Sequence, residues 1–519
     1  MPDTSPIVVG SKPGIKQDGT AFEGEYYVDG QWVRFQRGLP RKIGGYRQII
    51  GGLSGPPREL DVYSANGLNY VVNGHGAGVE QFTVDSMLNA SVISNRTPAG
   101  FASDPNNDWQ FCEVFDTASF KLKLLGIATP CLVNIDSTTT SPVYVGDAYG
   151  TAALVATATP PPTTNPSGGI FGLQSYAIIL GADGFVGWSV SNAPADFAGA
   201  GSGEARVTDQ KLIAGKPIRG SGGAATALLW SLDALVRMTF VGGAPVWGFD
   251  TISDESSIMS ANTVVEYDGI YYWMGVDRFL MFNGVLQELD NDLNLNFLFD
   301  NFNFAVRGKA FAFKVPRYGE IWFCVPLFGS SEPNWAIIYN VRESRRAGYP
   351  VWYDTPLPRD GRGAAHYAQV NRVPFMTGSS IITPNVGYAL WAHETGVDEI
   401  LGTQTNAIMS FFETAEISPI TGQKPVSQGL HVELIEPDFV QFGTIRAQVA
   451  GRQNARSPYQ LSAVRDIPQS AVTSDQQVVY FRENRRQMRF RFESNVAGGD
   501  YQMGLVIAHV GPADMRVLA

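Results

Sequence analysis

Residues 269–289 read GIYYWMGVDRFLMFNGVLQEL, and this stretch indicates the fold. Short runs of alternating aromatic and β-branched residues flank glycine-containing turns, which is typical of antiparallel hairpins. The same pattern occurs at residues 67–84 and 173–190, and longer versions occupy residues 320–341 and 373–394. One such hairpin cannot bury both of its faces, whereas several stacked around an axis can.

The repeats therefore predict a β-propeller, with repeats spaced by about 40–60 residues. Weaker copies at 111–126 and 226–249 are either blades or connections, so the count is six or seven, and six is favoured. The alternative is a set of unrelated hairpins in sandwiches, because neither a Trp-Asp repeat signature nor a kelch pattern is present. Two short segments favour helix, 231–238 and part of 291–306.

The pattern stops near residue 400, which predicts two domains. Residues 1–400 are expected to form the propeller, with an N-terminal strand closing the ring and a Pro/Thr/Gly-rich loop at 157–169. Residues 401–519 alternate polar and apolar residues in longer strands, which predicts an antiparallel β-sandwich. The expected fold class is all-β.

Charge is distributed unevenly between these two parts. The net charge is −11, from 38 Lys+Arg and 49 Asp+Glu. Residues 401–519 contain 11 of each kind, so residues 1–400 carry the whole excess, with 27 basic and 38 acidic residues. An acidic body repels DNA and anionic membranes at long range.

The cysteines and the apolar runs bear on the compartment. Cys112 and Cys324 lie in strand-like runs and Cys131 is widely separated from both, so buried free thiols in a reducing compartment are expected rather than a disulfide framework. The first 20 residues lack the pattern of a signal peptide, and no apolar run approaches 18 residues, so no membrane span is expected.

No motif for catalysis, cofactor binding or metal binding stands out. The run HETGVDE at 393–399 lacks the second histidine of a metalloprotease helix and is interpreted as a turn with exposed carboxylates. Phosphate-binding loops, dinucleotide-binding loops and nucleophile elbows are missing. The chain is expected to be no enzyme, with no cofactor and no metal site.

Two basic segments are the candidate contact sites. The run WVRFQRGLPRKIGGYR at 32–47 is predicted to form strand, turn and strand, with Gly38-Leu39-Pro40 in the turn. Pairing with carboxylates of the same chain or of the next subunit explains its charge better than nucleic acid does. The candidate contacts in this segment are Arg34, Arg37, Arg41, Lys42 and Arg47.

The second segment is RENRRQMRFRFES at 482–494. As a strand it places Arg485, Arg489 and Arg491 on one face and apolar residues on the other. These arginines face a partner or DNA in one interpretation, and form the solvated side of a half-buried strand in the other. Arg345 and Arg346 in ESRRAGYPVWYD, a predicted loop, allow the same two interpretations.

Several blocks, in order along the chain, resemble the tail nozzle proteins of short-tailed bacteriophages, also called packaged-DNA stabilisation proteins. The similar blocks are WVRFQRGLPRKIGGYR (32–47), VGWSVSNAPADF (186–197), YYWMGVDRFLMFNGVLQEL (271–289), LWAHETGVDE (390–399), IEPDFV (435–440) and RENRRQMRFRF (482–492). The loop at 157–169 has no counterpart in this pattern.

The resemblance implies a β-propeller with an added β-domain that forms a homo-oligomeric ring, sixfold in this family, below the portal and adaptor. The ring would extend the DNA channel, retain the packaged genome and contact tail fibre proteins. Double-stranded DNA would pass through the lumen without sequence-specific binding, since carboxylates repel phosphates. The protein would be made and assembled in the host cytoplasm and reside in the virion tail.

Other functions remain open from the sequence. A different tail component, such as a hub or a fibre-attachment protein, fits the same features. A soluble propeller that binds a ligand on one face would need no viral partner, and a phage-borne glycan-cleaving enzyme would need paired carboxylates at the propeller mouth.

Overall fold

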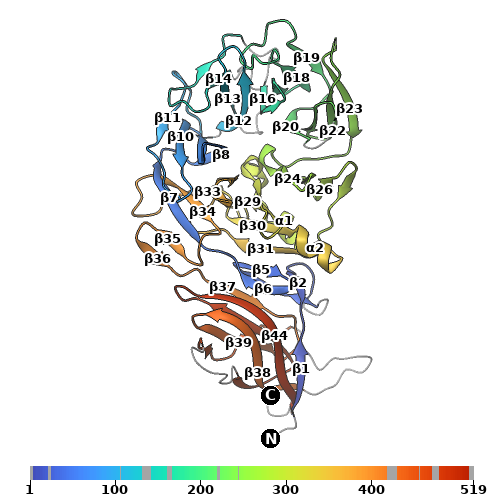
Figure 1. The fold of residues 1–519 in the computed structure, drawn as a ribbon. Helices are drawn as coiled ribbons and strands as arrows, with labels where there is room; N and C mark the ends of the chain where they lie inside the picture. The colour runs from blue at the N-terminus through green and yellow to red at the C-terminus, as the bar shows by residue number, and fades with distance from the viewer. Residues whose placement is uncertain are drawn as a thin grey trace.

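The fold combines a β-propeller with a β-sandwich placed beside it (Figure 1). The computed structural model describes residues 4–20, 25–105, 107–130, 142–159, 166–218, 223–243, 245–359, 361–417, 429–454, 456–469 and 478–513. Antiparallel pairing of neighbouring strands dominates both parts. The predicted all-β class, propeller plus antiparallel sandwich, is confirmed.

Seven four-stranded antiparallel units form the propeller among the described residues. Their strands, from the inner to the outer strand of each blade, are β8 (Pro57–Ala65), β9 (Leu68–His75), β10 (Gly78–Val84) and β11 (Ser94–Asn95); β12 (Asn107–Asp116), β13 (Lys121–Pro130), β14 (Val143–Asp147) and β15 (Val155–Ala156); β16 (Pro166–Leu173), β17 (Tyr176–Gly181), β18 (Phe185–Trp188) and β19 (Gly203–Arg206); β20 (Leu212–Pro217), β21 (Thr226–Ser231), β22 (Leu235–Phe240) and β23 (Trp247–Ser253); β24 (Val265–Tyr267), β25 (Ile270–Met274), β26 (Phe279–Phe282) and β27 (Leu286–Glu288); β28 (Phe311–Val315), β29 (Glu320–Val325), β30 (Trp335–Asn340) and β31 (Trp352–Pro356); and β32 (Ala364–Ala368), β33 (Val373–Thr377), β34 (Tyr388–His393) and β7 (Tyr46–Leu53).

The ring closes by contact between inner strands. β8 contacts both β12 and β32, and the series continues through β16 and β20 to the short helix η1 (Ala261–Thr263) and β28. The seventh blade is completed by β7 from the N-terminal region, which pairs antiparallel with β34 from Tyr46↔His393 to Leu53↔Tyr388. The chain therefore fastens its first blade to its last with one strand.

The blade count is seven, the alternative to the favoured six. Both weak sequence copies are blades, since 111–126 falls in β12 and β13 and 226–249 falls in β21 to β23. The predicted helix at 231–238 is wrong, because Ser231 ends β21 and Leu235 begins β22. The second predicted helix is present as α1 (Leu295–Asn301), followed by η2 (Phe304–Lys309).

Fully buried tryptophans pack between the blades and tie strands to loops. Trp109 Nε1 donates to the His75 carbonyl at 3.0 Å, and Trp273 Nε1 donates to the Ser257 carbonyl at 3.0 Å. Trp352 Nε1 donates to the Asp290 carbonyl at 2.7 Å. Each indole thus buries a large apolar surface while satisfying its one donor, which a buried tryptophan requires.

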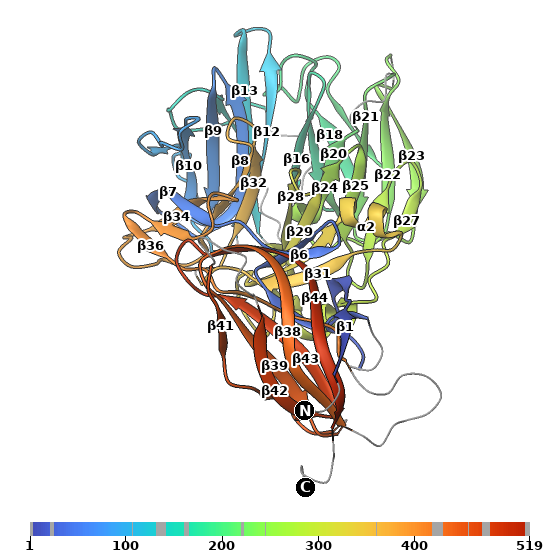
Figure 2. The same cartoon turned by 60° about the horizontal axis from the view of Figure 1, so that its bottom comes forward.

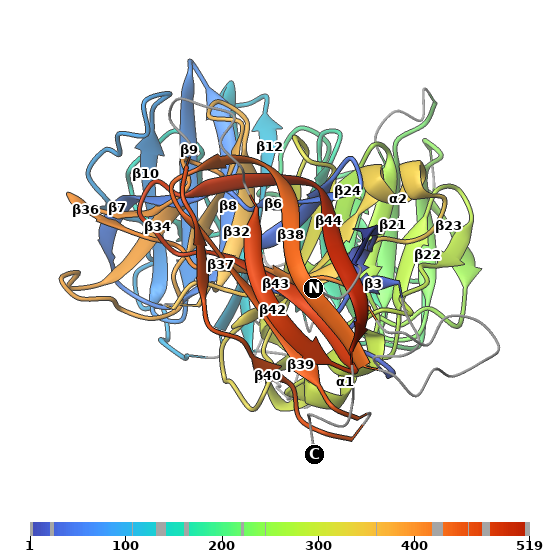
Figure 3. The ribbon, with the colours of Figure 1, turned by 90° about the horizontal axis from the view of Figure 1, so that it is seen from below.

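Two sheets form the sandwich, and β38 and β44 cross it in the views from below (Figures 2 and 3). One sheet has β42 (Val479–Arg485), β38 (Gly429–Phe442), β44 (Asp500–Ala513), β6 (Leu39–Lys42), β5 (Val33–Gln36) and β1 (Ser5–Val9). The other has β4 (Asp29–Gln31), β37 (Ser410–Glu413), β43 (Gln487–Ser494), β39 (Ile445–Arg452), β40 (Gln460–Leu461) and β41 (Arg465–Ile467).

The N-terminal segment joins both parts, which corrects the division at residue 400. β1 and β6 pair with β44, and β4 pairs with β37, so these strands belong to the sandwich rather than to the propeller. Near the predicted boundary, β35 (Glu399–Leu401) pairs parallel with β7 and antiparallel with β36 (Gln404–Asn406). Further N-terminal pairing links β2 (Lys12–Ile15) with β3 (Tyr26–Tyr27).

Local predictions have mixed outcomes. The turn of the basic hairpin is at Arg37 and Gly38, with φ of 56° and 80°, and Leu39 already belongs to β6. Positive φ at both central residues is the geometry of a tight hairpin turn, which favours glycine at the second position. In the predicted loop 157–169, residues 160–165 lie outside the described part of the chain, and Pro166 begins β16.

Cys112 and Cys324 are buried free thiols, as predicted, and Cys131 lies outside the described residues. Among the described residues, no helix has the length and apolar character needed to cross a membrane.

Candidate functional site: the arginine hairpin and the central channel

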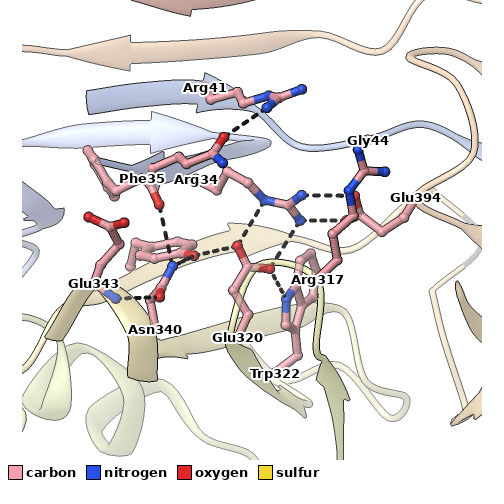
Figure 4. A network of polar contacts seen from close by, with 12 residues as sticks. Arg34, Phe35, Arg41, Gly44, Arg317, Glu320, Trp322, Asn340, Glu343 and Glu394 are labelled. Atoms are coloured by element: carbon pink, nitrogen blue, oxygen red, sulfur yellow. Dashed lines mark hydrogen bonds and ion pairs between the residues drawn. The ribbon is translucent and has the colours of Figure 1, made fainter. Parts of the chain in front are cut away.

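Arg34 of β5 lies in a buried ion-pair network where the hairpin meets the propeller (Figure 4). Its Nε is 2.8 Å from Glu320 Oε1, and its Nη2 donates to Glu320 Oε2 at 3.0 Å. On the other side, Nη1 donates to Glu394 Oε2 at 2.8 Å and Nη2 to Glu394 Oε1 at 2.5 Å. The guanidinium also lies 3.7 Å from the centre of the Tyr318 ring.

Glu320 has two further donors in this network. Trp322 Nε1 donates to its Oε2 at 2.9 Å, and the Tyr353 hydroxyl donates to its Oε1 at 2.7 Å. Burial raises the pKa of Glu320, and nearby Arg34 acts in the opposite direction. A carboxylate that accepts from three side chains has little capacity for a ligand, so this network joins the parts of the molecule.

The turn of the hairpin is fixed against helix α2 (Val341–Ala347). The backbone N–H groups of Arg37 and Gly38 each donate to the Glu343 carboxylate at 2.8 Å. Asn340 caps the helix by accepting from the Glu343 N–H at 2.9 Å, and Gly348 ends it in the left-handed conformation. The predicted loop at Arg345 and Arg346 is therefore the last turn of a helix.

The other basic residues of the hairpin differ in their environment. Lys42 is buried, and its Nζ donates to the Gly499 carbonyl of the sandwich at 2.7 Å. Burial lowers the pKa of Lys42. Arg41 donates to Gln36 Oε1 at 2.8 Å, while Arg37 and Arg47 are exposed. Contact of these residues with another subunit stays a prediction.

In the sandwich, Glu413 receives two of the three predicted arginines. Arg489 Nε is 2.6 Å from Glu413 Oε2, and Arg491 Nη1 donates to Glu413 Oε1 at 3.0 Å. Arg485 pairs with Glu483 at 3.1 Å. The apolar side chains of β43, Met488, Phe490 and Phe492, are buried. The alternation is as the sequence suggested, and a partner for the arginines outside the chain stays a prediction.

A charged cavity of about 310 Å³ lies among the inner strands of the propeller. Its lining combines carboxylates, lysines and a histidine, and includes Glu59, Asp61, Lys216, Glu266, Lys314 and His366. Sequence reasoning missed this group. Glu59 and Asp61 alternate with apolar residues along β8, and that alternation was the available signal, but the ring is needed to bring distant strands to one channel.

Asp61 and Glu113 form a carboxyl pair on neighbouring inner strands, within hydrogen-bonding contact of each other. Burial raises the pKa of Glu113 to about 10, and the charge of Asp61 adds to this rise. Burial acts against ionisation of Asp61 as well, but contacts with His366 and Glu113 lower its pKa to about 2. The pair therefore shares one proton at neutral pH.

The chemistry available in the channel is proton storage and electrostatics. His366 Nδ1 lies 3.4 Å from Asp61 Oδ1 and accepts from the Val62 N–H at 3.0 Å. Within the described residues, no group of three or more His, Cys, Asp and Glu side chains is arranged to hold a metal ion.

No protein-family model and no curated protein matches the sequence. Among solved structures, the fold is similar to the WD40 β-propeller domain of Doa1, with a TM-score of 0.39, 11% identity, and coverage of 67% of this chain and 97% of that chain. It is also similar to the computationally designed Ika8 protein, with a TM-score of 0.34, 11% identity, and coverage of 67% and 99%. The number and closure of the blades come from the strand pairing.

Proposed function

We propose that the chain is a structural protein of a short-tailed phage, which forms the nozzle ring below the portal and adaptor and retains the packaged DNA. The observation that carries the proposal is the contact between two of the blocks that resemble this family. Arg34 of the block 32–47 and Glu394 of the block 390–399 form a buried ion pair, 360 residues apart. Strings matched by chance have no reason to meet in a buried joint.

The joint also supports a mechanical role. A nozzle wall has to hold its shape while DNA under pressure is retained behind it. The N-terminal segment contributes strands to both sandwich sheets and then completes the seventh blade, so both parts share continuous hydrogen-bonded sheets. A linker without such pairing would allow the two parts to move as separate bodies.

The acidic character of residues 1–400 suits a wall past which DNA moves. Carboxylates repel phosphates, so DNA would pass without being held, and sequence-specific contacts would be a disadvantage. No catalytic step is part of this proposal.

The test is the composition of purified tailed particles from the genome that encodes this chain. Mass spectrometry should find about six copies per particle, as a closed ring of identical subunits requires. Particles assembled without the protein should lose DNA, which nuclease sensitivity of the genome would measure.

Two outcomes would reject the proposal. Absence of the protein from particles would favour the soluble binding propeller. A copy number of about three, or a location at the fibres in electron micrographs of labelled particles, would favour a hub or a fibre-attachment protein.

A further inference from the structure

Arginines from three distant segments meet on one face of the propeller. The hairpin turn lies against α2 through the Glu343 carboxylate, which brings Arg37 to the helix. Arg342 donates to the carbonyls of Arg317 at 2.7 Å and of Pro316 at 3.1 Å, which brings the β28–β29 turn to the same place. The exposed members of this arginine patch are Arg37, Arg317, Arg342, Arg345 and Arg346.

The patch has an excess of positive charge over its own carboxylates. Glu343 lies beneath it, with 6% of its side chain exposed, and pairs with Arg346 at 3.4 Å. Asp268 pairs with Arg345 at 3.5 Å, and both of these side chains are more than half exposed. Two carboxylates thus face five exposed arginines, in a chain whose net charge is −11.

An acidic group lies at the opposite face of the neighbouring blades. Asp268 precedes β25 and Asp277 follows it, so the length of this strand separates the two faces. The Ser256 N–H donates to the Asp233 carbonyl at 2.9 Å, which places the loop after β23 beside the turn of the fourth blade. The exposed members of this acidic group are Asp233, Asp254, Glu255, Asp277 and Glu288, with Arg278 paired to the last two.

We propose that the arginine patch of one copy binds the acidic group of a second copy. The proposal deepens the proposed function and rests on it, because it names the surfaces through which successive copies of the ring join. Different surfaces on opposite faces give a head-to-tail contact, and such contacts close into a ring when the rotation between copies allows it.

The composition of the patch favours a protein partner over nucleic acid. All five of its exposed basic residues are arginines, and Tyr318 and Tyr349 lie among them, partly buried. Arginine and tyrosine are enriched at protein interfaces and lysine is depleted there. The negative charge of the rest of the chain would repel a duplex at long range, whereas a second copy presents carboxylates in a compact group.

The experiment uses charge reversal at each surface of the full-length chain. R345E/R346E changes the patch, and D254R/E255R changes the acidic group. The wild-type chain should self-associate in sedimentation velocity at about 50 mM salt and dissociate at about 500 mM. Each variant alone should raise the dissociation constant between copies at least about tenfold.

Mixing the two variants gives the decisive result. In an alternating assembly each contact pairs opposite charges again, so an equimolar mixture should regain the wild-type association. R206E/R237E reverses two exposed arginines of the third and fourth blades and should associate as the wild type does. Melting temperature and circular dichroism check folding, and D254R/E255R keeps the test valid should the helix variant misfold, since it changes an exposed loop.

Three results would overturn the proposal. They are a wild-type chain that stays monomeric at low salt, a mixture that fails to regain association, and unchanged association of R345E/R346E. In the last case, weaker binding of that variant to a fluorescent DNA duplex would assign the patch to nucleic acid instead. Particles with about six copies of an R345E/R346E chain would reject these surfaces while keeping the proposed ring.

Discussion

Arg34 and Glu320 are 286 residues apart in the sequence, and their side chains form a fully buried ion pair in which Nε and Oε1 are 2.8 Å apart. Glu394 shares the same guanidinium. One buried cation thus holds two buried carboxylates, and removing it would leave both without their main partner.

We therefore expect Arg34→Met to lower the free energy of unfolding by about 3–5 kcal/mol. Urea titration monitored by tryptophan fluorescence measures the loss, because Trp322 lies in the network. Arg47→Met is the control, since this arginine is exposed, and its effect should stay within about 0.5 kcal/mol. The triple change R34M/E320Q/E394Q should recover part of the loss. Equal effects of R34M and R47M would contradict this account.

The closing strand gives a second prediction. Deletion of residues 1–50 removes most of β7, so β34 would lose its outer partner and the seventh blade would open. We expect faster hydrogen exchange of the amides at 388–393 and a lower melting temperature. Deletion of residues 1–10 removes β1 and leaves β7, so exchange at 388–393 should not change. Equal protection of β34 in both deletions would show that β7 does not close the ring.

Local pattern made the hairpins predictable, because each strand pair with its turn is encoded within about 20 residues. The blade count was not, since β12 to β13 and β21 to β23 have weaker alternation and acquire their place from the neighbouring blades. The division at residue 400 also failed for a physical reason. Strands such as β1 and β4 pair with partners some 400 to 500 residues away, and nothing in a short strand specifies a distant partner.

The candidate site was predictable only as residue types. The sequence pointed to Arg34 and its neighbours, and to pairing with carboxylates of the same chain as one possibility, but Glu320 and Glu394 are ordinary residues in the sequence. Arg317 and Arg342 were missed because each is a single arginine between apolar residues. They join the patch only when the β28–β29 turn meets α2.

Glu413 gives a third prediction, because it is 5% exposed and receives both Arg489 and Arg491. Glu413→Gln keeps the shape and removes the charge, so two half-buried guanidinium groups would lose their shared anion. We expect a loss of about 1–3 kcal/mol in the free energy of unfolding. Arg485→Met, on the edge of the same sheet, should cost less, and a larger effect of that change would contradict the role of Glu413.

The channel pair gives a prediction with a sign. Burial and the charge of Asp61 raise the pKa of Glu113 to about 10 in the folded chain, whereas an unfolded glutamate has a pKa of about 4.3. Between these values the folded state binds one proton more than the unfolded state, so this group makes stability fall as pH rises. The low pKa of Asp61 affects stability only in acid, below this range.

Glu113→Gln should therefore stabilise the chain relative to the wild type, and the advantage should grow between about pH 5 and about pH 9. The upper bound is about 1.4 kcal/mol per pH unit, which is the value for one proton. Melting temperatures of both chains across this range provide the measurement, and Glu255→Gln is the matched control because its carboxyl group is exposed. A difference that stays constant with pH would show that Glu113 is ionised in the folded protein. The two carboxylates would then have to be held apart by Lys216 or His366, rather than joined by a proton, because two buried negative charges in contact repel each other strongly.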